Sequence, residues 1–322
     1  MLPRVSRTFA LTIRLLSPQL AYTVTVAYLL CRVADTLEDS AELPPPDRAA
    51  LLARFRACLS DARLDAAPLR DAFGGATHPD RVLAREADIV LREFRRLLPA
   101  EQDAIRPGVE EMCTGMAAFV TSLAGRPGQL RALDDVKELE RYCYYVAGTV
   151  GELLTRLFVL KMPRIRQRRA DRLFALSTRF ALGLQVTNIL QDVAADAERG
   201  VGFVPRELVS QSTGGNGAPV APRAPGPLVK LALDRLNDAM DYSATLPWYQ
   251  YRMRLFCLAP AYLAVRTLGA VTRHGTNGSS GGKPKISRGE VRRTLAVTVA
   301  VAPFNGLLRL YYRLLARKVR LG

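Results

Sequence analysis

Apolar residues recur at the spacing of an α-helix along almost the whole of this 322-residue chain, and this pattern restricts its fold more than any other feature. No stretch alternates apolar and polar residues as a half-buried strand does, and no Asn-Gly turn joins two such stretches. We therefore expect an all-α fold, a helical bundle whose facing helices surround a central cavity. The pattern predicts helices over residues 7–16, 19–37, 46–59, 78–97, 101–122, 133–160, 168–197, 227–245, 249–273 and 287–320.

Hydrophobic residues make up 49% of the chain, which is enough to bury a large core. Gly and Pro concentrate in residues 210–227 and 274–284, and this predicts two flexible surface loops. Nothing in the composition indicates a separate catalytic unit on either side of these loops. The sequence therefore predicts a single domain that spans residues 1–322.

The formal net charge of +16 predicts an anionic partner, such as nucleic acid, an anionic lipid or a polyphosphate substrate. Aromatic residues make up only 7% of the chain, and it contains no zinc-finger or RNA-recognition motif. We therefore expect no nucleic-acid partner. Both histidines, His78 and His274, lie in Gly-containing loop sequence, which argues against a histidine-centred triad or metal site.

The five cysteines are scattered and lack the CxxC spacing that many metal and redox sites use. We interpret them as reduced thiols in the core of a cytoplasmic protein. Residues 1–20 contain three arginines and no clear cleavage signature, so we expect no signal peptide.

A first polar stripe consists of Tyr28, Arg32, Asp35 and Asp39, which follow one another at spacings of four, three and four residues. These spacings place the four side chains on one face of a helix. Two aspartates four residues apart repel each other, and a bound divalent cation would turn that repulsion into binding. A solvated helix end is the alternative interpretation.

A second polar stripe consists of Gln185, Asn188, Asp192, Asp196 and Arg199, again on one helical face of an otherwise apolar segment. Such a stripe is costly to bury unless it is hydrogen-bonded or faces a wet or metal-filled cavity. Mg²⁺, with Mn²⁺ as an alternative, prefers one or two carboxylates together with substrate phosphates. The two stripes together predict a clamp for a diphosphate.

The segment 142–154 predicts a wall beside such a clamp. Ionisation of an allylic diphosphate leaves a carbocation, which needs an apolar pocket with little water. Tyr142 shares a stripe with Val146, Thr149 and Leu153, and its ring could stabilise a cation or its hydroxyl could move a proton. Ordinary helix packing is the alternative. The small apolar segment 115–119 is a second candidate wall.

Taken in order, these segments resemble the squalene/phytoene synthase family over nearly the entire chain. Ser6-Arg7-Thr8-Phe9 is similar to the family's Ser-Arg-Ser-Phe opening, and residues 35–39 match its first aspartate-rich motif. Residues 142–148 resemble its catalytic tyrosine segment. Residues 185–196 match its second aspartate-rich motif, and residues 202–205 resemble the sequence that follows it.

The resemblance implies head-to-head condensation of two farnesyl diphosphates through presqualene diphosphate to squalene. It implies that Mg²⁺ is bound by Asp35, Asp39, Asp192 and Asp196, and that Tyr142 acts in proton transfer or cation stabilisation. Tyr28 and Arg32 would act beside it. The residues implied to bind substrate are Ser6, Arg7, Thr8, Phe9, Val146, Gln185, Asn188 and Arg199.

Two positions depart from the family pattern. Gln191 stands where squalene synthases often have arginine, and Ala195 stands where an acidic residue usually precedes the last aspartate. Fewer charges around the second motif would alter metal affinity or the orientation of the diphosphate. Arg199 could supply a compensating cation.

The sequence constrains the product of the reaction less than it constrains the family. Squalene formation needs a hydride from NADPH, whereas the alternatives, which are phytoene, dehydrosqualene and hydroxysqualene synthases, need none. The chain contains no dinucleotide-binding fingerprint. Residues 285–289 resemble a Lys-Ile-x-x-Gly segment in which a basic residue meets the cofactor phosphate, so Lys285 and Arg288 are the candidate NADPH contacts. A solvated basic loop is the alternative.

Residues 295–310 are apolar, but Pro303, Asn305 and Arg309 interrupt them, and the rest is too short to span a membrane. The following helix has an apolar face of Leu307, Leu308, Tyr311, Leu314 and Leu315. Its basic face consists of Arg309, Arg313, Arg317 and Arg320.

This pattern predicts peripheral attachment of a cytoplasmic, monomeric protein to an anionic membrane. The alternative is a core helix with a charged outer face. A function of another class, a non-catalytic basic adaptor at the membrane surface, would also fit the charge.

Overall fold

The computed structural model describes residues 2, 8–122, 131–198, 201–209, 224–274 and 283–320. These residues are almost entirely helical, as the apolar period predicts. The strands among them are β1 (Arg131–Ala132) and β2 (Val201–Gly202), which pair in parallel. The all-α prediction is therefore confirmed. Most of the two predicted loops, residues 210–223 and 275–282, and the candidate site residues Ser6, Arg7 and Arg199 lie outside the described residues.

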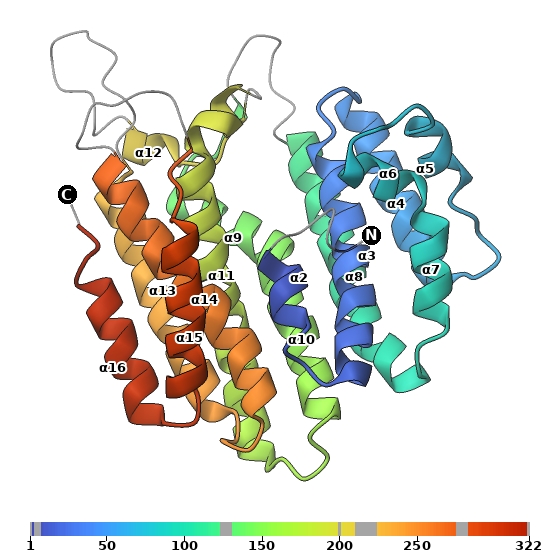
Figure 1. Ribbon diagram of the computed structural model, residues 1–322. Helices are drawn as coiled ribbons and strands as arrows, with labels where there is room; N and C mark the ends of the chain where they lie inside the picture. The colour runs from blue at the N-terminus through green and yellow to red at the C-terminus, as the bar shows by residue number, and fades with distance from the viewer. Residues whose placement is uncertain are drawn as a thin grey trace, which may run out of the picture. The chain divides into compact units, whose positions relative to one another are not determined.

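The chain divides into two compact units, each described separately below. Unit 1 consists of Met1–Ala124 and Tyr144–Ala170, and unit 2 consists of Gly125–Cys143 and Asp171–Gly322. Figure 1 labels their helices. The single domain and the central cavity stay predictions.

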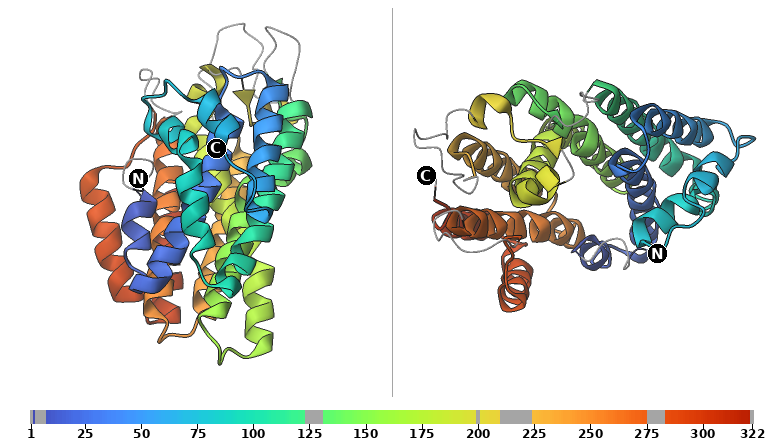
Figure 2. Two further views of the ribbon diagram at one scale, coloured as in Figure 1. Left: turned by 90° about the vertical axis from the view of Figure 1, so that its right-hand side faces the viewer. Right: turned by 90° about the horizontal axis from the view of Figure 1, so that it is seen from above.

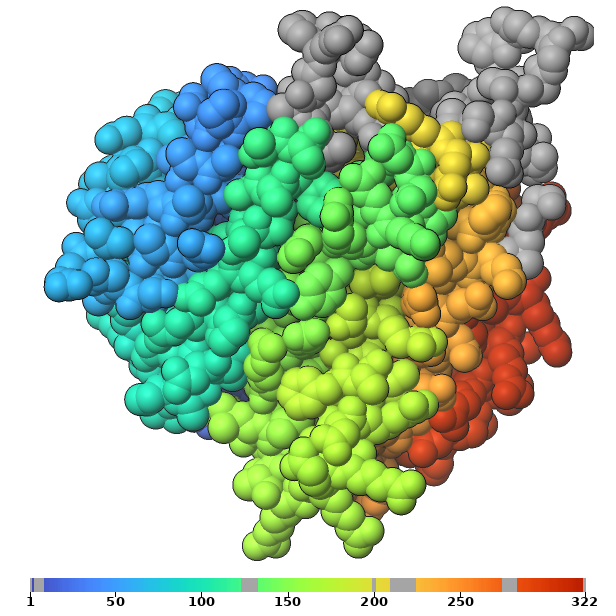
Figure 3. All heavy atoms as spheres, turned by 180° about the vertical axis from the view of Figure 1, so that it is seen from behind, coloured from blue at the N-terminus to red at the C-terminus, as the bar shows by residue number. Residues whose placement is uncertain are grey.

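Unit 1 is built around a long helix, α8 (Pro99–Ser122), which packs against α3, α4 and α10. Figure 3 shows α4, α8 and α10 side by side on one face. The other helical elements of unit 1 are α2 (Thr8–Ile13), α3 (Pro18–Asp39), α4 (Pro45–Ser60), α5 (Ala67–Ala72), α6 (Pro79–Arg85), α7 (Ala87–Arg95), the π-helix η1 (Tyr144–Gly148) and α10 (Thr149–Leu160).

Two glycines of α8 allow this packing. A Cβ atom on Gly108 would lie 3.1 Å from the Cβ of Leu153 in α10. A Cβ atom on Gly115 would lie 2.0 Å from the Cγ of Tyr145, which is far inside contact distance. The absence of a side chain at Gly115 therefore lets the Tyr145 ring reach α8, where it meets the ring of Phe119 at 6.2 Å.

Unit 2 is built around α14 (Tyr251–His274), which packs against α13, α15 and α16. Both views in Figure 2 show α15, in orange-red, projecting from the rest of unit 2. The other helices of the unit are α9 (Val136–Cys143), α11 (Gln167–Glu198, whose first four residues belong to unit 1), α12 (Arg206–Val209), α13 (Gly226–Thr245), α15 (Arg288–Val301) and α16 (Asn305–Ala316).

Several predicted helices are interrupted. The helix predicted over 78–97 divides into α6 and α7 at Glu86, whose ψ of 26° is not helical. The helix predicted over 287–320 ends at Val301 and restarts at Asn305, because Pro303 has no N–H to donate and Phe304 is extended. The short helices α5 and α12 were not predicted, since each is too short for a periodic pattern.

The last helix also differs from its predicted faces. Leu308 and Leu315 are buried as core residues, as the alternative interpretation requires. Leu307 and Leu314, assigned to the same apolar face, are exposed together with Leu310. α16 therefore has an inner and an outer apolar side.

By length and apolar composition alone, four described segments could cross a membrane: Pro18–Asp39, Val136–Leu160, Gln167–Glu198 and Tyr251–Arg273. In the last of these, 72% of the apolar window is buried inside the protein. This helix, α14, therefore serves as the core of unit 2.

Candidate functional site

The first polar stripe lies on α3, which begins with a proline in its first turn and buries Leu30, Val33 and Leu37 on its opposite side. On the polar side, Arg32 donates two hydrogen bonds to Asp80, from Nε at 3.1 Å and from Nη2 at 2.9 Å. The third guanidinium nitrogen of Arg32, Nη1, lies 3.7 Å from Asp35. A bidentate pair of this kind fixes the guanidinium plane.

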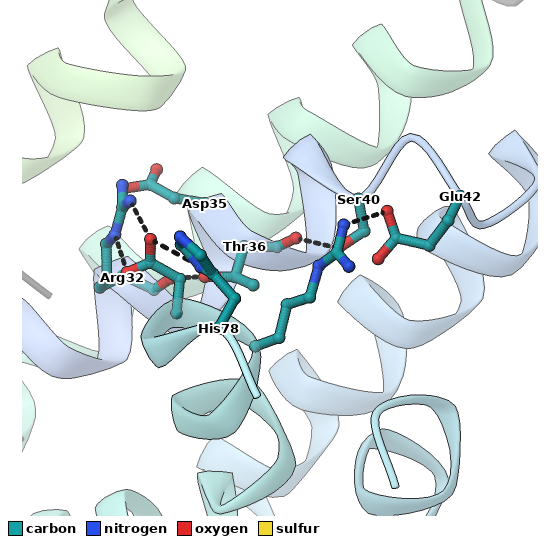
Figure 4. A network of polar contacts seen from close by, with 8 residues as sticks. Arg32, Asp35, Thr36, Ser40, Glu42 and His78 are labelled. Carbon is teal, nitrogen blue, oxygen red and sulfur yellow. Dashed lines mark hydrogen bonds and ion pairs between the residues drawn. The ribbon is translucent and has the colours of Figure 1, made fainter. Parts of the chain in front are cut away.

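Asp80, in the first turn of α6, and His78, whose Nδ1 lies 3.7 Å from it, were not predicted as site residues. The only local signal for Asp80 is an acidic residue at a helix start, which is common in any protein. Figure 4 shows Arg32, Asp35 and His78 gathered at this point.

The pKa of Asp35 is raised to about 7, because burial disfavours its charged form and the carboxylates of Asp39 and Asp80 repel it. Arg32 opposes this shift but does not cancel it. A carboxylate in these surroundings gains more from a bound cation than an exposed one does. The first stripe therefore fits a divalent cation.

Hydrogen bonds hold the end of α3 in place. Thr36 Oγ1 donates to the carbonyl of Arg32 at 2.8 Å, and Ser40 Oγ donates to the carbonyl of Thr36 at 2.6 Å. Figure 4 shows Thr36 and Ser40 together with Glu42, which accepts a separate hydrogen bond of 2.8 Å from Nη2 of Arg81. One turn earlier in the helix, the ring of Tyr28 meets the ring of Phe9 at 5.5 Å. Unit 1 thus brings together two predicted site residues from different helices.

The second polar stripe lies on α11, whose apolar residues Val186, Ile189 and Leu190 are buried. Along the stripe, Gln185 and Asp192 are half-buried and Asn188 is exposed. Asp196 is buried, with 4% of its surface exposed. The division into apolar and polar sides is the one that the sequence predicts.

The segment that precedes α15, residues 283–287, contacts α11 at this stripe. The ammonium group of Lys283 forms an ion pair with Oδ1 of Asp192, a buried atom. Next to it, Gln191 Nε2 donates a hydrogen bond of 2.7 Å to the carbonyl of Pro284. Gln191, one of the two positions that depart from the family pattern, therefore binds the segment that contains Lys283. No local pattern in the sequence indicates this pairing.

The candidate cofactor residues Lys285 and Arg288 are both exposed, on the same segment and at the start of α15. Between them, Ser287 caps α15 through a capping box with Glu290. The capping box fixes the direction in which the segment enters α15.

Tyr142 lies in the last turn of α9 and is buried, with 4% of its surface exposed. Its ring stacks on Phe203, with centroids 4.6 Å apart and an interplanar angle of 20°. Phe203 belongs to the segment that follows the second stripe, and Glu207 in that segment accepts a hydrogen bond of 2.9 Å from the N–H of Val136. Unit 2 thus joins the tyrosine segment to the sequence after the second motif.

The π-helix η1 follows directly, and each π-turn holds one residue more than an α-turn. The helical phase therefore shifts between Tyr142 and Leu153, and the single stripe predicted for them does not run unbroken. Within unit 1, Tyr144 donates a hydrogen bond of 2.8 Å to Glu111, which together with burial raises the pKa of Tyr144. Tyr144 and Tyr145, which contact Glu111 and Phe119 of α8, are residues that the sequence did not single out.

Among the residues that the structure describes, no group of three or more His, Cys, Asp or Glu side chains is arranged to hold a metal ion alone. The donors are instead pairs of aspartates on single helices. Such pairs fit Mg²⁺, which takes one or two carboxylates and completes its shell with phosphate and water. All five cysteines are buried and free, as predicted for core thiols.

Comparison with known proteins gives a consistent result. The family model described as squalene/phytoene synthase matches residues 2–290. The squalene synthase of Candida albicans is 30% identical over 297 residues, covering 89% of this chain and 62% of that protein. The squalene synthase of Eremothecium gossypii is 31% identical over 281 residues, covering 84% and 60%. The chain thus spans about three fifths of the length of these relatives.

Solved structures agree. A complex of TcSQS with the ligand E5700 aligns with a TM-score of 0.80 and 26% identity, covering 99% of this chain and 90% of that one. A dehydrosqualene synthase aligns with a TM-score of 0.63 at 20% identity, covering 93% of each chain, and this likeness concerns the fold alone.

Proposed function

This chain belongs to the squalene/phytoene synthase family, and from that premise we propose that it is a Mg²⁺-dependent prenyltransferase that makes squalene from farnesyl diphosphate. Two farnesyl diphosphates would be joined head to head through presqualene diphosphate, with NADPH as the hydride donor. Squalene synthases among the relatives support the choice of product. The observation that carries the proposal is the partly buried Arg32–Asp35–Asp80 cluster, which suits a metal and a diphosphate.

The metal would be held by Asp35 and Asp39 from α3 and by Asp192 and Asp196 from α11. When bound, Mg²⁺ would act as a Lewis acid that neutralises charge on the departing pyrophosphate. Arg32 would act in the same direction. Its Nε and Nη2 are engaged by Asp80, so Nη1 is the nitrogen directed toward Asp35 and available to the diphosphate.

Tyr142 would act on the prenyl chain of the substrate. Burial against Phe203 keeps water from its ring, which suits stabilisation of a carbocation, and its hydroxyl could carry a proton. Lys285 and Arg288, both exposed, would contact a phosphate of NADPH. NADPH would supply the hydride that converts the cyclopropyl intermediate to squalene.

The test is to incubate the purified protein with farnesyl diphosphate and Mg²⁺, with and without NADPH, and to identify products by mass spectrometry. Squalene that forms only with NADPH, and is lost in Asp35→Asn and Asp192→Asn, is the expected result. A dehydrogenated C30 product regardless of NADPH would move the chain to the branch without hydride transfer. No turnover of farnesyl or geranylgeranyl diphosphate would favour the non-catalytic adaptor.

We further propose that the protein works at the cytoplasmic surface of a membrane, from which a C30 hydrocarbon could be released. The excess positive charge supports an anionic surface. Flotation with anionic vesicles tests this point independently of catalysis.

A further inference from the structure

Five large apolar side chains are exposed at two turns of unit 2, and we call them the apolar tip: Trp248, Tyr249, Val299, Phe304 and Leu307. Each is between 46% and 70% exposed. The first two lie between α13 and α14, and the other three lie at the end of α15 and the start of α16. Contiguous exposed apolar surface on a soluble protein usually marks an interaction site.

The two turns are held side by side by a buried arginine. Arg254, 2% exposed, donates from Nη2 to the carbonyl of Leu246 at 2.6 Å and from Nη1 to the carbonyl of Ala302 at 2.9 Å. Tyr251 adds a hydrogen bond of 2.7 Å to the carbonyl of Val299. These bonds fix the main chain of both turns, so the backbone of the apolar tip does not have to be ordered when it binds.

The charge around the apolar tip indicates the kind of partner that binds it. Residues 242–322 contain fourteen Lys and Arg residues and a single acid, Glu290, so they carry +13 of the net charge of +16. Between 295 and 308, the stretch that contains most of the apolar tip, no residue is charged. The charges resume at Arg293 on one side and, on the other, at Arg309, which is paired with Asp241, so the apolar end is flanked mainly by basic residues.

The nearest exposed bases on α15 are Arg292 and Arg293, and Arg313 on α16 and Arg317 directly after it are exposed as well. At a rise of about 1.5 Å per residue, Arg293 lies roughly 9 Å along the helix from Val299. Amphipathic surfaces bury their apolar side about 5–10 Å into the boundary between headgroups and acyl chains. Apolar residues at that depth would leave these arginines near the lipid phosphates.

We propose that the apolar tip inserts into the interface of an anionic lipid bilayer, with Trp248 and Tyr249 as anchors and the arginines of α15 and α16 against the headgroups. Trp and Tyr favour this interface because each has an apolar body and a polar edge. The inference deepens the proposed membrane attachment and assigns it to a surface. It does not depend on catalysis, since binding and turnover are measured separately.

The test uses the fact that Trp248 is the only tryptophan in the chain. The full chain is mixed with phosphatidylcholine vesicles with or without phosphatidylglycerol, and tryptophan emission is recorded. We expect a blue shift with phosphatidylglycerol vesicles, quenching by brominated acyl chains, and a loss of binding of at least tenfold at high salt. The absence of a shift with any vesicle would overturn the proposal.

The variant Phe304→Ser/Leu307→Ser removes apolar surface and retains the reporter, and it should bind phosphatidylglycerol vesicles at least tenfold more weakly. The matched control is Leu98→Ser, which removes a comparably exposed side chain (56%) from unit 1. Equal losses in both variants would overturn the assignment. Circular dichroism establishes that each variant is folded.

Two further outcomes would identify another occupant. A blue shift that grows with protein concentration in the absence of lipid would indicate that the apolar tip binds a second copy. If the wild type and Arg292→Gln/Arg293→Gln bind neutral and anionic vesicles equally well, the basic residues do not contribute to binding. Either result contradicts insertion guided by anionic lipid.

Discussion

The ammonium group of Lys283 lies against the carboxylate of Asp192, in the second polar stripe. A divalent cation bound by Asp192 must compete with this ammonium for the same buried oxygen. We therefore expect Lys283→Gln to bind Mn²⁺ about three- to tenfold more tightly than the wild type, because a competing ion pair of this kind is worth on the order of 1 kcal/mol. Electron paramagnetic resonance of free Mn²⁺ measures the affinity.

The control for this experiment is Lys230→Gln. It removes the same charge from α13, where Lys230 lies 3.9 Å from Asp234. A similar gain in both variants would reflect net charge alone. Unchanged or weaker Mn²⁺ binding in Lys283→Gln would mean that Lys283 does not compete with the metal.

The raised pKa of Asp35 predicts a pH dependence. The folded protein keeps a proton on Asp35 up to about pH 7, whereas the unfolded chain loses it near pH 3.8. Between these values the folded state binds more protons, so its stability falls as pH rises and stays lower above pH 7. Asp35→Asn should be more stable than the wild type at pH 8 without metal, by on the order of 1–2 kcal/mol.

Urea unfolding at pH 5 and pH 8 measures this difference. Mg²⁺ should stabilise the wild type at pH 8 and have little effect on Asp35→Asn. Asp103→Asn, an exposed position on α8, serves as the control and should follow the wild type at both pH values. A variant Asp35→Asn that is less stable than the wild type at pH 8 would contradict the assigned cause.

The close contact at Gly115 predicts a loss of stability on adding one methyl group. Gly115→Ala would place Cβ against the root of the Tyr145 ring, where the neighbouring atoms cannot move aside easily. We expect a loss of about 1–3 kcal/mol in the free energy of unfolding, as for other overpacked cores. Gly306→Ala, at an open position in the first turn of α16, should be neutral or stabilising by up to about 1 kcal/mol in the same measurement, because alanine favours a helix over glycine.

Both polar stripes could be predicted from the sequence, because each lies within one helix and helical spacing determines which side chains share a face. The buried positions Val33 and Val186, on the opposite faces, follow from the same rule. The partners of the stripes could not be predicted. Asp80 is 48 residues from Arg32 along the chain, and no local pattern links them.

Gln191 illustrates the same limit. The family pattern often has a charged arginine at this position, so the sequence alone indicates only a lost charge. In the structure the amide of Gln191 binds the carbonyl of Pro284, next to Lys283. The π-turn after Tyr142 was missed for a different reason. A single extra residue per turn leaves almost no trace in a short apolar pattern, although it changes which faces continue into α10.

The buried Arg254 predicts a large effect on stability. Its guanidinium binds main-chain carbonyls at the ends of α13 and α15, including those of Ala244, Leu246 and Ala302. Arg254→Met keeps most of the side-chain volume and leaves these carbonyls without a donor, so we expect a loss of about 3–5 kcal/mol in urea unfolding. The exposed Arg313→Met is the control, and a loss below about 1 kcal/mol in Arg254→Met would contradict the role.

The last prediction separates two neighbouring tyrosines. Tyr142→Phe keeps the ring on Phe203 and removes only the hydroxyl, so we expect turnover of farnesyl diphosphate to fall at least about a hundredfold, as for a lost proton carrier. Tyr144→Phe removes the hydrogen bond to Glu111, which should cost about 1 kcal/mol of stability and affect turnover far less. Product formation and urea unfolding are measured on both variants. If Tyr144→Phe loses turnover and Tyr142→Phe keeps it, the proton carrier is Tyr144, and the stacked ring of Tyr142 serves only to shape the pocket.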